Sequence, residues 1–132
     1  MDFKLELVAV PVSDVDRAKA FYEERAGFAV DNDVTVKDGL RFIQLTPPGS
    51  ACSVAIGEGI TEMEPGSIEG LQLVVDDIEA AREELSGRGV PVSDIQDFPW
   101  GRFVFFSDPD GNGWAIQQLP DYGEGRTQPE GT

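Results

Sequence analysis

An internal repeat is the feature of this sequence that most constrains its fold. The segment LVAVPVSDVDRAKAFYEERAGFAV at residues 7–30 and the segment LQLVVDDIEAAREELSGRGVPV at residues 71–92 follow the same plan. Each has an alternating apolar run, an acidic turn, a helical stretch that ends near glycine and a second apolar run. Further along, LRFIQLTPPG at 40–49 corresponds to GRFVFFSDPDG at 101–111. The repeat therefore predicts two copies of one structural unit.

Each copy is predicted to contain a strand, a helix and then three strands. Ser13 is interpreted as the N-cap of the first helix and Gly27 as its end, because these residue types favour those positions. In the second copy, Asp76 and Glu79 have the spacing of a capping box, and the helix is expected to end at Gly87 or Gly89. Short apolar runs bounded by turn residues are interpreted as strands. These runs lie at 5–12, 28–36, 40–46, 51–57, 90–96, 102–107 and 113–119.

Length and composition indicate one domain. The 132 residues, of which 40% are hydrophobic, suffice for a single core. We expect an α+β domain over residues 1–119, with modules at about 3–57 and 69–119. Residues 58–68, rich in Gly, Pro and Glu, are interpreted as a surface connector, and residues 120–132 as a polar tail.

The charge balance limits the partners. Ten Lys and Arg stand against 25 Asp and Glu, which gives a formal net charge of −15. Nucleic acid and anionic membrane surfaces would be repelled, whereas a neutral or cationic ligand would not. Because the sequence shows neither a signal segment nor a long apolar run, we expect a cytoplasmic protein.

The absence of histidine removes the commonest general base and a common metal ligand. The single cysteine, Cys52, lies in the apolar run SACSVAI. Without a histidine to activate it, Cys52 is interpreted as a small packing residue and not as a nucleophile.

The tandem units, with VSDVDRAKAFYEERAGF after the first strand and FSDPDGNGWAIQQL at the end, resemble the vicinal-oxygen-chelate superfamily. That superfamily includes glyoxalase I, extradiol dioxygenases and bleomycin-resistance proteins. The resemblance implies tandem βαβββ modules whose eight strands curl into a half-open cup, with the ligand inside and the helices outside. It also implies a homodimer.

Metal-dependent members of that superfamily hold the metal on the first and last strands of each module. The resemblance places these positions at Leu7, Gly70, Ala115 and near Ser53. Such residues are poor metal ligands, so neither a metal nor another cofactor is expected. Gln72 and Gln117 share the inward faces of their strands and are suited to hydrogen-bonding a carbonyl or hydroxyl of a ligand.

Aromatic residues surround the site in which the metal-ligand positions carry no ligating side chains, and they favour a planar ligand. Two functions remain open. The first is a binding protein that sequesters an aromatic or polycyclic antibiotic without converting it. The second is a metal-independent isomerase, cyclase or lyase, for which Glu58 is the candidate base; because no catalytic dyad is evident, binding is favoured. The predicted ligand-binding residues are Leu7, Ser53, Gln72, Phe98, Trp100, Phe103, Phe105, Ala115 and Gln117.

Overall fold

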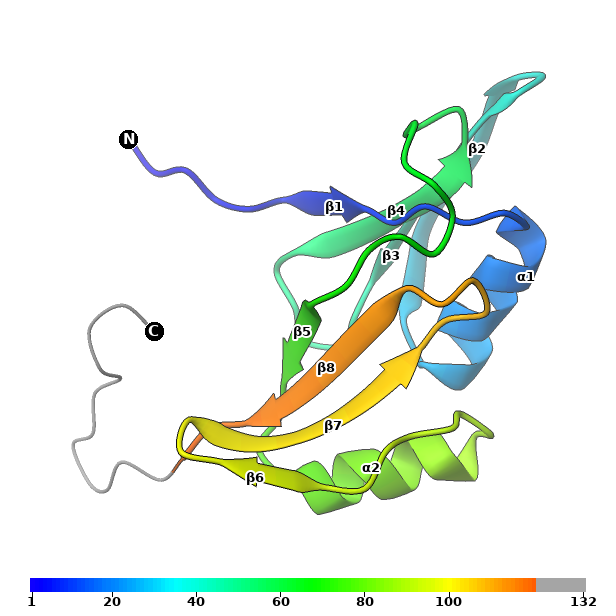
Figure 1. The fold of residues 1–132 in the computed structure, drawn as a ribbon. Coiled ribbons are helices and arrows are strands. Elements are labelled where there is room, and N and C mark those ends of the chain that lie inside the picture. The colour runs from blue at the N-terminus through cyan, green and yellow to red at the C-terminus, as the bar shows by residue number, and fades with distance from the viewer. Residues whose placement is uncertain (121–132) are drawn as a thin grey trace.

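The fold is a tandem βαβββ arrangement with two four-stranded mixed sheets (Figure 1). It is taken from a computed structural model that describes residues 1–120. Sheet A has the order β1-β4-β3-β2, and sheet B has the order β5-β8-β7-β6. The strands are β1 (Leu7–Ala9), β2 (Ala29–Lys37), β3 (Leu40–Thr46), β4 (Ser53–Glu58), β5 (Leu71–Val74), β6 (Gln96–Phe98), β7 (Gly101–Ser107) and β8 (Gly113–Gln118).

The same pairing pattern occurs in both sheets and confirms the repeat. The first strand of each module is parallel to the last strand, as β1 is to β4 and β5 to β8. The other neighbours are antiparallel. Such a parallel pair requires a long crossover connection, which each module supplies with its helix and the two intervening strands.

Two helical segments follow the first strands: α1 (Val15–Ala20), continued by a π-helical turn η1 (Phe21–Arg25), and α2 (Ile78–Gly87). The predicted caps were one residue too early. Asp14 caps α1 by accepting a hydrogen bond from the Arg17 amide, and Asp77 caps α2 in the same way. In each case the extended backbone at the second residue of the acidic turn lets its carboxylate reach the third amide of the helix.

Two predicted strands were placed inaccurately. The first strand is shorter than 5–12, because ladder pairing with β4 begins only at Leu7. The strand expected at 90–96 is mostly irregular, and β6 begins at Gln96. Upstream of β6, Ser93 is hydrogen-bonded to Phe105 of β7 without forming a regular strand pair. The Ser93 amide donates to the Phe105 carbonyl, and the Ser93 hydroxyl accepts from the Phe105 amide.

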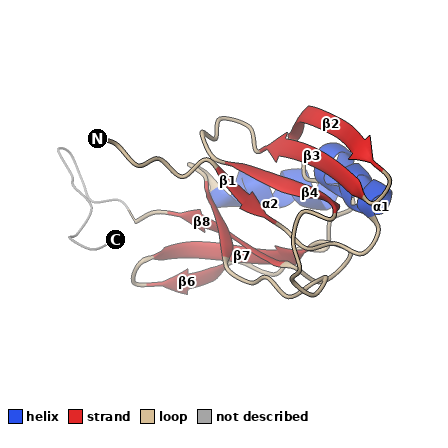
Figure 2. Cartoon of the chain, turned by 90° about the horizontal axis from the view of Figure 1, so that it is seen from above, coloured by secondary structure: helices blue, strands red, loops and turns tan. Residues whose placement is uncertain are grey.

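The helix-facing sides of both sheets contribute to one buried core. Phe21 lies 6.3 Å from Phe106 between ring centroids, and Tyr22 lies 5.8 Å from Trp114. These contacts join the first module's helical segment to strands of the second module. Both helices lie beyond the strands of sheet A in the view from above (Figure 2). No helix in residues 1–120 is long and apolar enough to cross a membrane.

A buried polar network fixes the same junction. The Tyr22 hydroxyl donates to Asp108 Oδ2 at 2.7 Å and accepts from the Trp114 indole at 3.0 Å. Asn112 Nδ2 donates to Asp108 Oδ2 and to the Pro11 carbonyl, both at 2.8 Å. Burial, together with the Asp108 carboxylate, raises the pKa of the Tyr22 hydroxyl. Tyr22 therefore stays protonated and remains a donor to Asp108.

A second network ties α1 to sheet A and predicts acid sensitivity. Hydrogen bonds from Arg41 and Lys19 hold the pKa of Asp33 well below its usual range. A depressed pKa in the folded state stabilises the protein above the unfolded value of about 4, and this contribution is lost as the pH falls through the folded value. We expect Asp33→Asn to cost about 1 kcal/mol at pH 7. The difference from the parent protein should shrink steadily in urea titrations taken down to pH 2.

Candidate functional site

Each sheet has an open face that is turned away from the core. On sheet B, strand pairing sets Gln72 beside Ala115, Ala115 beside Phe105, and Gln117 beside Phe103. Because side chains alternate along a strand, these residues share one face. Their neighbours in the chain, such as Trp114 and Val104, lie on the core side. The open face of sheet B thus collects most of the residues that the sequence predicted to bind a ligand.

Four aromatic rings on this face form a continuous series, here called the aromatic ladder. Trp100 stacks on Phe98 with centroids 5.3 Å apart and planes within 10°. Phe98 meets Phe103 edge-on at 5.7 Å, and Phe103 stacks on Phe105 at 6.0 Å. Phe103 is buried between its neighbours, whereas Trp100 is 57% exposed, Phe98 40% and Phe105 38%. Three large apolar rings of the series are therefore open to solvent.

The β6–β7 hairpin positions the end of the aromatic ladder. Phe98 pairs with Gly101, so only Pro99 and Trp100 form the loop. Gly101 has φ of 147°, and a Cβ there would lie 2.7 Å from the Gln118 carbonyl oxygen. Glycine is needed at this residue because the hairpin crosses so close to β8. The tight loop brings Trp100 back over Phe98.

The two glutamines of this face bind each other and the hairpin. Gln72 Nε2 donates to Gln117 Oε1 at 2.5 Å. Gln117 Nε2 in turn donates to the backbone carbonyl of Trp100 at 2.8 Å. The amide of Gln117 is thus hydrogen-bonded at both ends, an arrangement that could not be predicted from the sequence.

The open face of sheet A carries a polar cluster beside its parallel strand pair. Ser53 is buried, accepts from Gln44 Nε2 at 3.2 Å, and lies 2.6 Å from Thr46 between hydroxyl oxygens. Thr46 also donates to the carboxylate of Asp31. Since the Thr46 hydrogen is used on Asp31, Ser53 must donate to Thr46. A hydrogen-bonded chain therefore leads from a buried serine to an exposed carboxylate.

The register identifies the equivalent positions of the two modules. Leu7 lies opposite Ser53, and Gln72 lies opposite Ala115. Arg41 lies opposite Glu58, and its counterpart in the repeat, Arg102, lies opposite Gln118, so Ala55 aligns with Ala115. Because Ala9 pairs with Ala55, Ala9 is the first-module equivalent of Gln72, and Leu7 corresponds to Gly70. The first-module equivalent of Ala115 is thus Ala55, two residues after the predicted Ser53. Within residues 1–120, no group of three or more His, Cys, Asp or Glu side chains could hold a metal ion.

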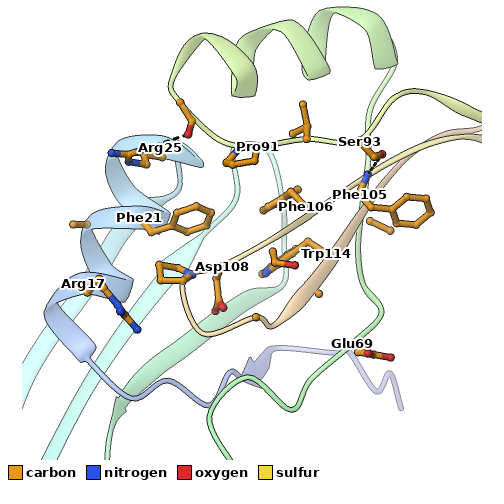
Figure 3. Close-up of a pocket in the computed structure, with 18 of the residues that line it drawn as sticks. Arg17, Phe21, Arg25, Glu69, Pro91, Ser93, Phe105, Phe106, Asp108 and Trp114 are labelled. Atoms are coloured by element: carbon orange, nitrogen blue, oxygen red, sulfur yellow. Dashed lines mark hydrogen bonds between the residues drawn. The ribbon is translucent and has the colours of Figure 1, made fainter.

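A large pocket of about 1220 Å³ lies where the end of sheet B meets the first helical segment (Figure 3). Phe21 points from η1 toward Phe106, while Arg17 and Arg25 project from the same helical segment. Phe105 and Ala115 belong both to this pocket and to the open face of sheet B. The aromatic ladder therefore runs from the hairpin to the pocket.

The structure brings together most, but not all, of the predicted ligand-binding residues. Seven of them share sheet B and its hairpin, whereas Leu7 and Ser53 pair on sheet A. Glu58, the candidate base, is exposed at the end of β4. Asp31, Thr46 and the pocket residues of the first helical segment were not predicted from the sequence. Their proximity depends on strand register and on helix packing between modules, for which no short motif exists.

The tandem modules have a direct counterpart among protein families. The sequence matches the Glyoxalase/Bleomycin resistance protein/Dioxygenase superfamily over residues 4–116. The chain belongs to this superfamily. The resemblance drawn from the repeat and the DPDGN turn is thereby confirmed, as is the tandem βαβββ fold.

Individual relatives cover nearly the whole chain. The crystal structure of TnmS3, an antibiotic binding protein from Streptomyces sp. CB03234, is 39% identical with a TM-score of 0.82, covering 90% of this chain and 98% of that one. A superfamily member from Sphaerobacter thermophilus DSM 20745 is 32% identical with a TM-score of 0.78, covering 89% and 98%. Uncharacterized protein YetH of Bacillus subtilis (strain 168) is 29% identical over 115 residues, covering 84% and 94%.

Proposed function

We propose that the protein binds an aromatic or polycyclic small molecule, such as an antibiotic, and releases it chemically unchanged. The observation that carries this proposal is the aromatic ladder, in which three exposed rings lie on one sheet face. Stacking on such rings contributes about 0.5–1.5 kcal/mol per pair beyond burial. TnmS3, an antibiotic binding protein, supports the same class of ligand.

The surface charge refines the ligand class. With a net charge of −15, the protein attracts cations at long range and raises their association rate at low ionic strength. We therefore expect cationic members of a ligand series to associate faster than neutral ones, by a factor that falls as salt is added.

Binding and turnover are separated by recovering the ligand. A thermal-shift screen of polycyclic aromatic antibiotics, with peptide antibiotics as a comparison set, identifies compounds that stabilise the folded protein. Mass spectrometry after long incubation then follows each bound compound. We expect intact compound at stoichiometric binding. Multiple-turnover conversion into a product would contradict sequestration.

We propose further that binding needs no metal. Leu7 and Ala115 offer no side-chain donor, and Gln72 and Ser53 are both hydrogen-bonded within their own sheets. Elemental analysis of the purified protein is expected to show no stoichiometric zinc, iron, nickel or manganese. A stoichiometric metal whose removal abolished ligand affinity would refute this expectation.

We also propose a homodimer, in which a second copy covers the edge strands that a single chain leaves exposed. Val74, on the edge strand of sheet B, is 63% exposed, and Val34, on the edge strand of sheet A, is 49% exposed. Apolar residues on unpaired edges and faces are usually covered in soluble proteins. Light scattering is expected to give twice the chain mass at micromolar concentration. A monomeric mass would contradict this arrangement.

The hydroxyl chain on sheet A favours the second candidate function, a metal-independent isomerase, cyclase or lyase. Asp31 is the carboxylate at its end, and the chain through Thr46 to Ser53 could carry a proton. If turnover is found, Asp31→Asn should abolish it while leaving ligand affinity within about threefold. Equal turnover in both proteins would exclude this base.

A further inference from the structure

Gln117 lies in the middle of the open face of sheet B, and both ends of its amide are hydrogen-bonded within the protein. Its Nε2 donates to the Trp100 carbonyl, and its Oε1 accepts from Gln72. We propose that Gln117 is a positioning residue, which holds the β6–β7 hairpin so that Trp100 extends the aromatic ladder. This inference rests on the proposed function, since it concerns the same binding face.

The orientation of the Gln117 amide is determined by its partners. Trp100 presents a carbonyl oxygen, which only a donor can satisfy. Gln72 places its Nε2 against the other end of the Gln117 amide, which must therefore be the oxygen. Reversing the amide would set two oxygens together at one end and two NH₂ groups at the other. The Trp100 carbonyl thus selects the orientation of the Gln117 amide, and Gln72 stabilises it by donating to Oε1.

The other contacts of the hairpin are its strand pairing, a hydrogen bond of 2.9 Å from Arg102 Nε to Asp97 Oδ1, and the ring contacts of Phe98. The Gln117 bond differs from these because it holds the backbone of the loop residue Trp100. The hairpin loop has only two residues, and the Trp100 ring is 57% exposed, with Phe98 as its stacking partner. Phe98 is itself 40% exposed on a three-residue edge strand. A loop tip of this kind moves on the nanosecond scale unless it is tied down. Ordering such a loop upon binding lowers affinity, so a hydrogen bond that orders it beforehand raises affinity.

The test uses ligand-free protein labelled with 5-fluorotryptophan and observed by ¹⁹F NMR. The two tryptophans give two resonances, assigned through Trp100→Phe. Trp114 is buried in the core and reports on folding. Gln117→Met keeps the side-chain length but removes donor and acceptor, and Gln72→Met removes only the second bond. Gln96→Met, on the neighbouring edge strand and opposite Phe103, is the matched control.

We expect Gln117→Met to narrow the Trp100 resonance and move it toward that of free 5-fluorotryptophan. Gln72→Met should cause a smaller change in the same direction, and Gln96→Met none. The Trp114 resonance should stay in place in all three variants. An unchanged Trp100 resonance in Gln117→Met would overturn the proposal. If Gln117→Met does not fold, Gln117→Glu decides in its place, since it keeps the shape and cannot donate.

Ligand titrations of the same samples separate this proposal from the proposed function. With the tightest-binding compound of the antibiotic panel, Gln117→Met should bind about 3- to 10-fold more weakly. Unchanged affinity, despite a released Trp100, would overturn the role of Gln117 in binding. If no compound binds any sample while Gln117→Met still releases Trp100, the proposed function fails. The role of Gln117 in holding the β6–β7 hairpin then stands without a role in ligand binding.

Discussion

Replacing Asp108 by alanine is expected to lower the free energy of unfolding by about 3–5 kcal/mol. The carboxylate is buried and accepts four hydrogen bonds, from the Tyr22 hydroxyl, the Asn112 side chain and the amides of Asp110 and Asn112. Alanine would leave these donors without their acceptor, and two of them, on Tyr22 and Asn112, are fully buried side-chain groups. Urea titrations at fixed protein concentration measure the loss.

Urea titrations of two further variants separate the effect of the hydrogen-bond network around Asp108 from that of the turn at 108–112. Pro109→Ala alters the exposed neighbour and should cost less than 1 kcal/mol. Tyr22→Phe removes one donor from Asp108 and the acceptor of the Trp114 indole, so a cost of about 1–3 kcal/mol is expected. The double variant should cost less than the sum of the single variants, because both act on one network. Additive losses would show that the two modules are not coupled through Asp108.

Much of the fold could be predicted because the repeat encodes it twice. Alternating apolar runs separated by an acidic turn and a glycine predicted two βαβββ modules, and the paired sheets confirm them. Errors occurred where a local signal was degenerate. Ser13 and Asp14 are both good caps, and only the backbone angles decide between them. At 90–96, apolar residues that resemble a strand instead fill the space between α2 and β7.

The site was harder to predict, because it depends on register. The first-module counterpart of Ala115 was expected near Ser53, but the pairing of β4 with β3 and of β8 with β7 puts Ala55 there. The first copy lacks the DPDGN turn that marks the start of the last strand in the second copy, so counting along the chain does not locate this position. Similarly, Asp31 lies in a polar stretch of β2 that suggests only an exposed edge. Its link to Thr46 arises from the bulge after Val30, which shifts the register of β2.

Trp100→Ala is expected to weaken binding of the tightest ligand by about 1–3 kcal/mol, or about 5- to 150-fold in Kd. The ring is 57% exposed and lies parallel to Phe98, so a planar ligand that stacks on it extends the aromatic ladder by one more layer. Because the ring is at a loop tip and outside the core, the free energy of unfolding should change by less than about 1 kcal/mol.

Calorimetry with the parent protein, Trp100→Ala and Trp100→Phe tests the stacking directly. Phenylalanine retains an aromatic face at the hairpin tip, so most of the affinity should return, whereas alanine leaves Phe98 as the end of the aromatic ladder. A loss of heat-capacity change on binding should accompany the loss of affinity, since apolar area is no longer buried. If all three proteins bind equally well, the ligand does not stack on the hairpin. The pocket beside η1, which Phe105 and Ala115 also line, is then the next site to test.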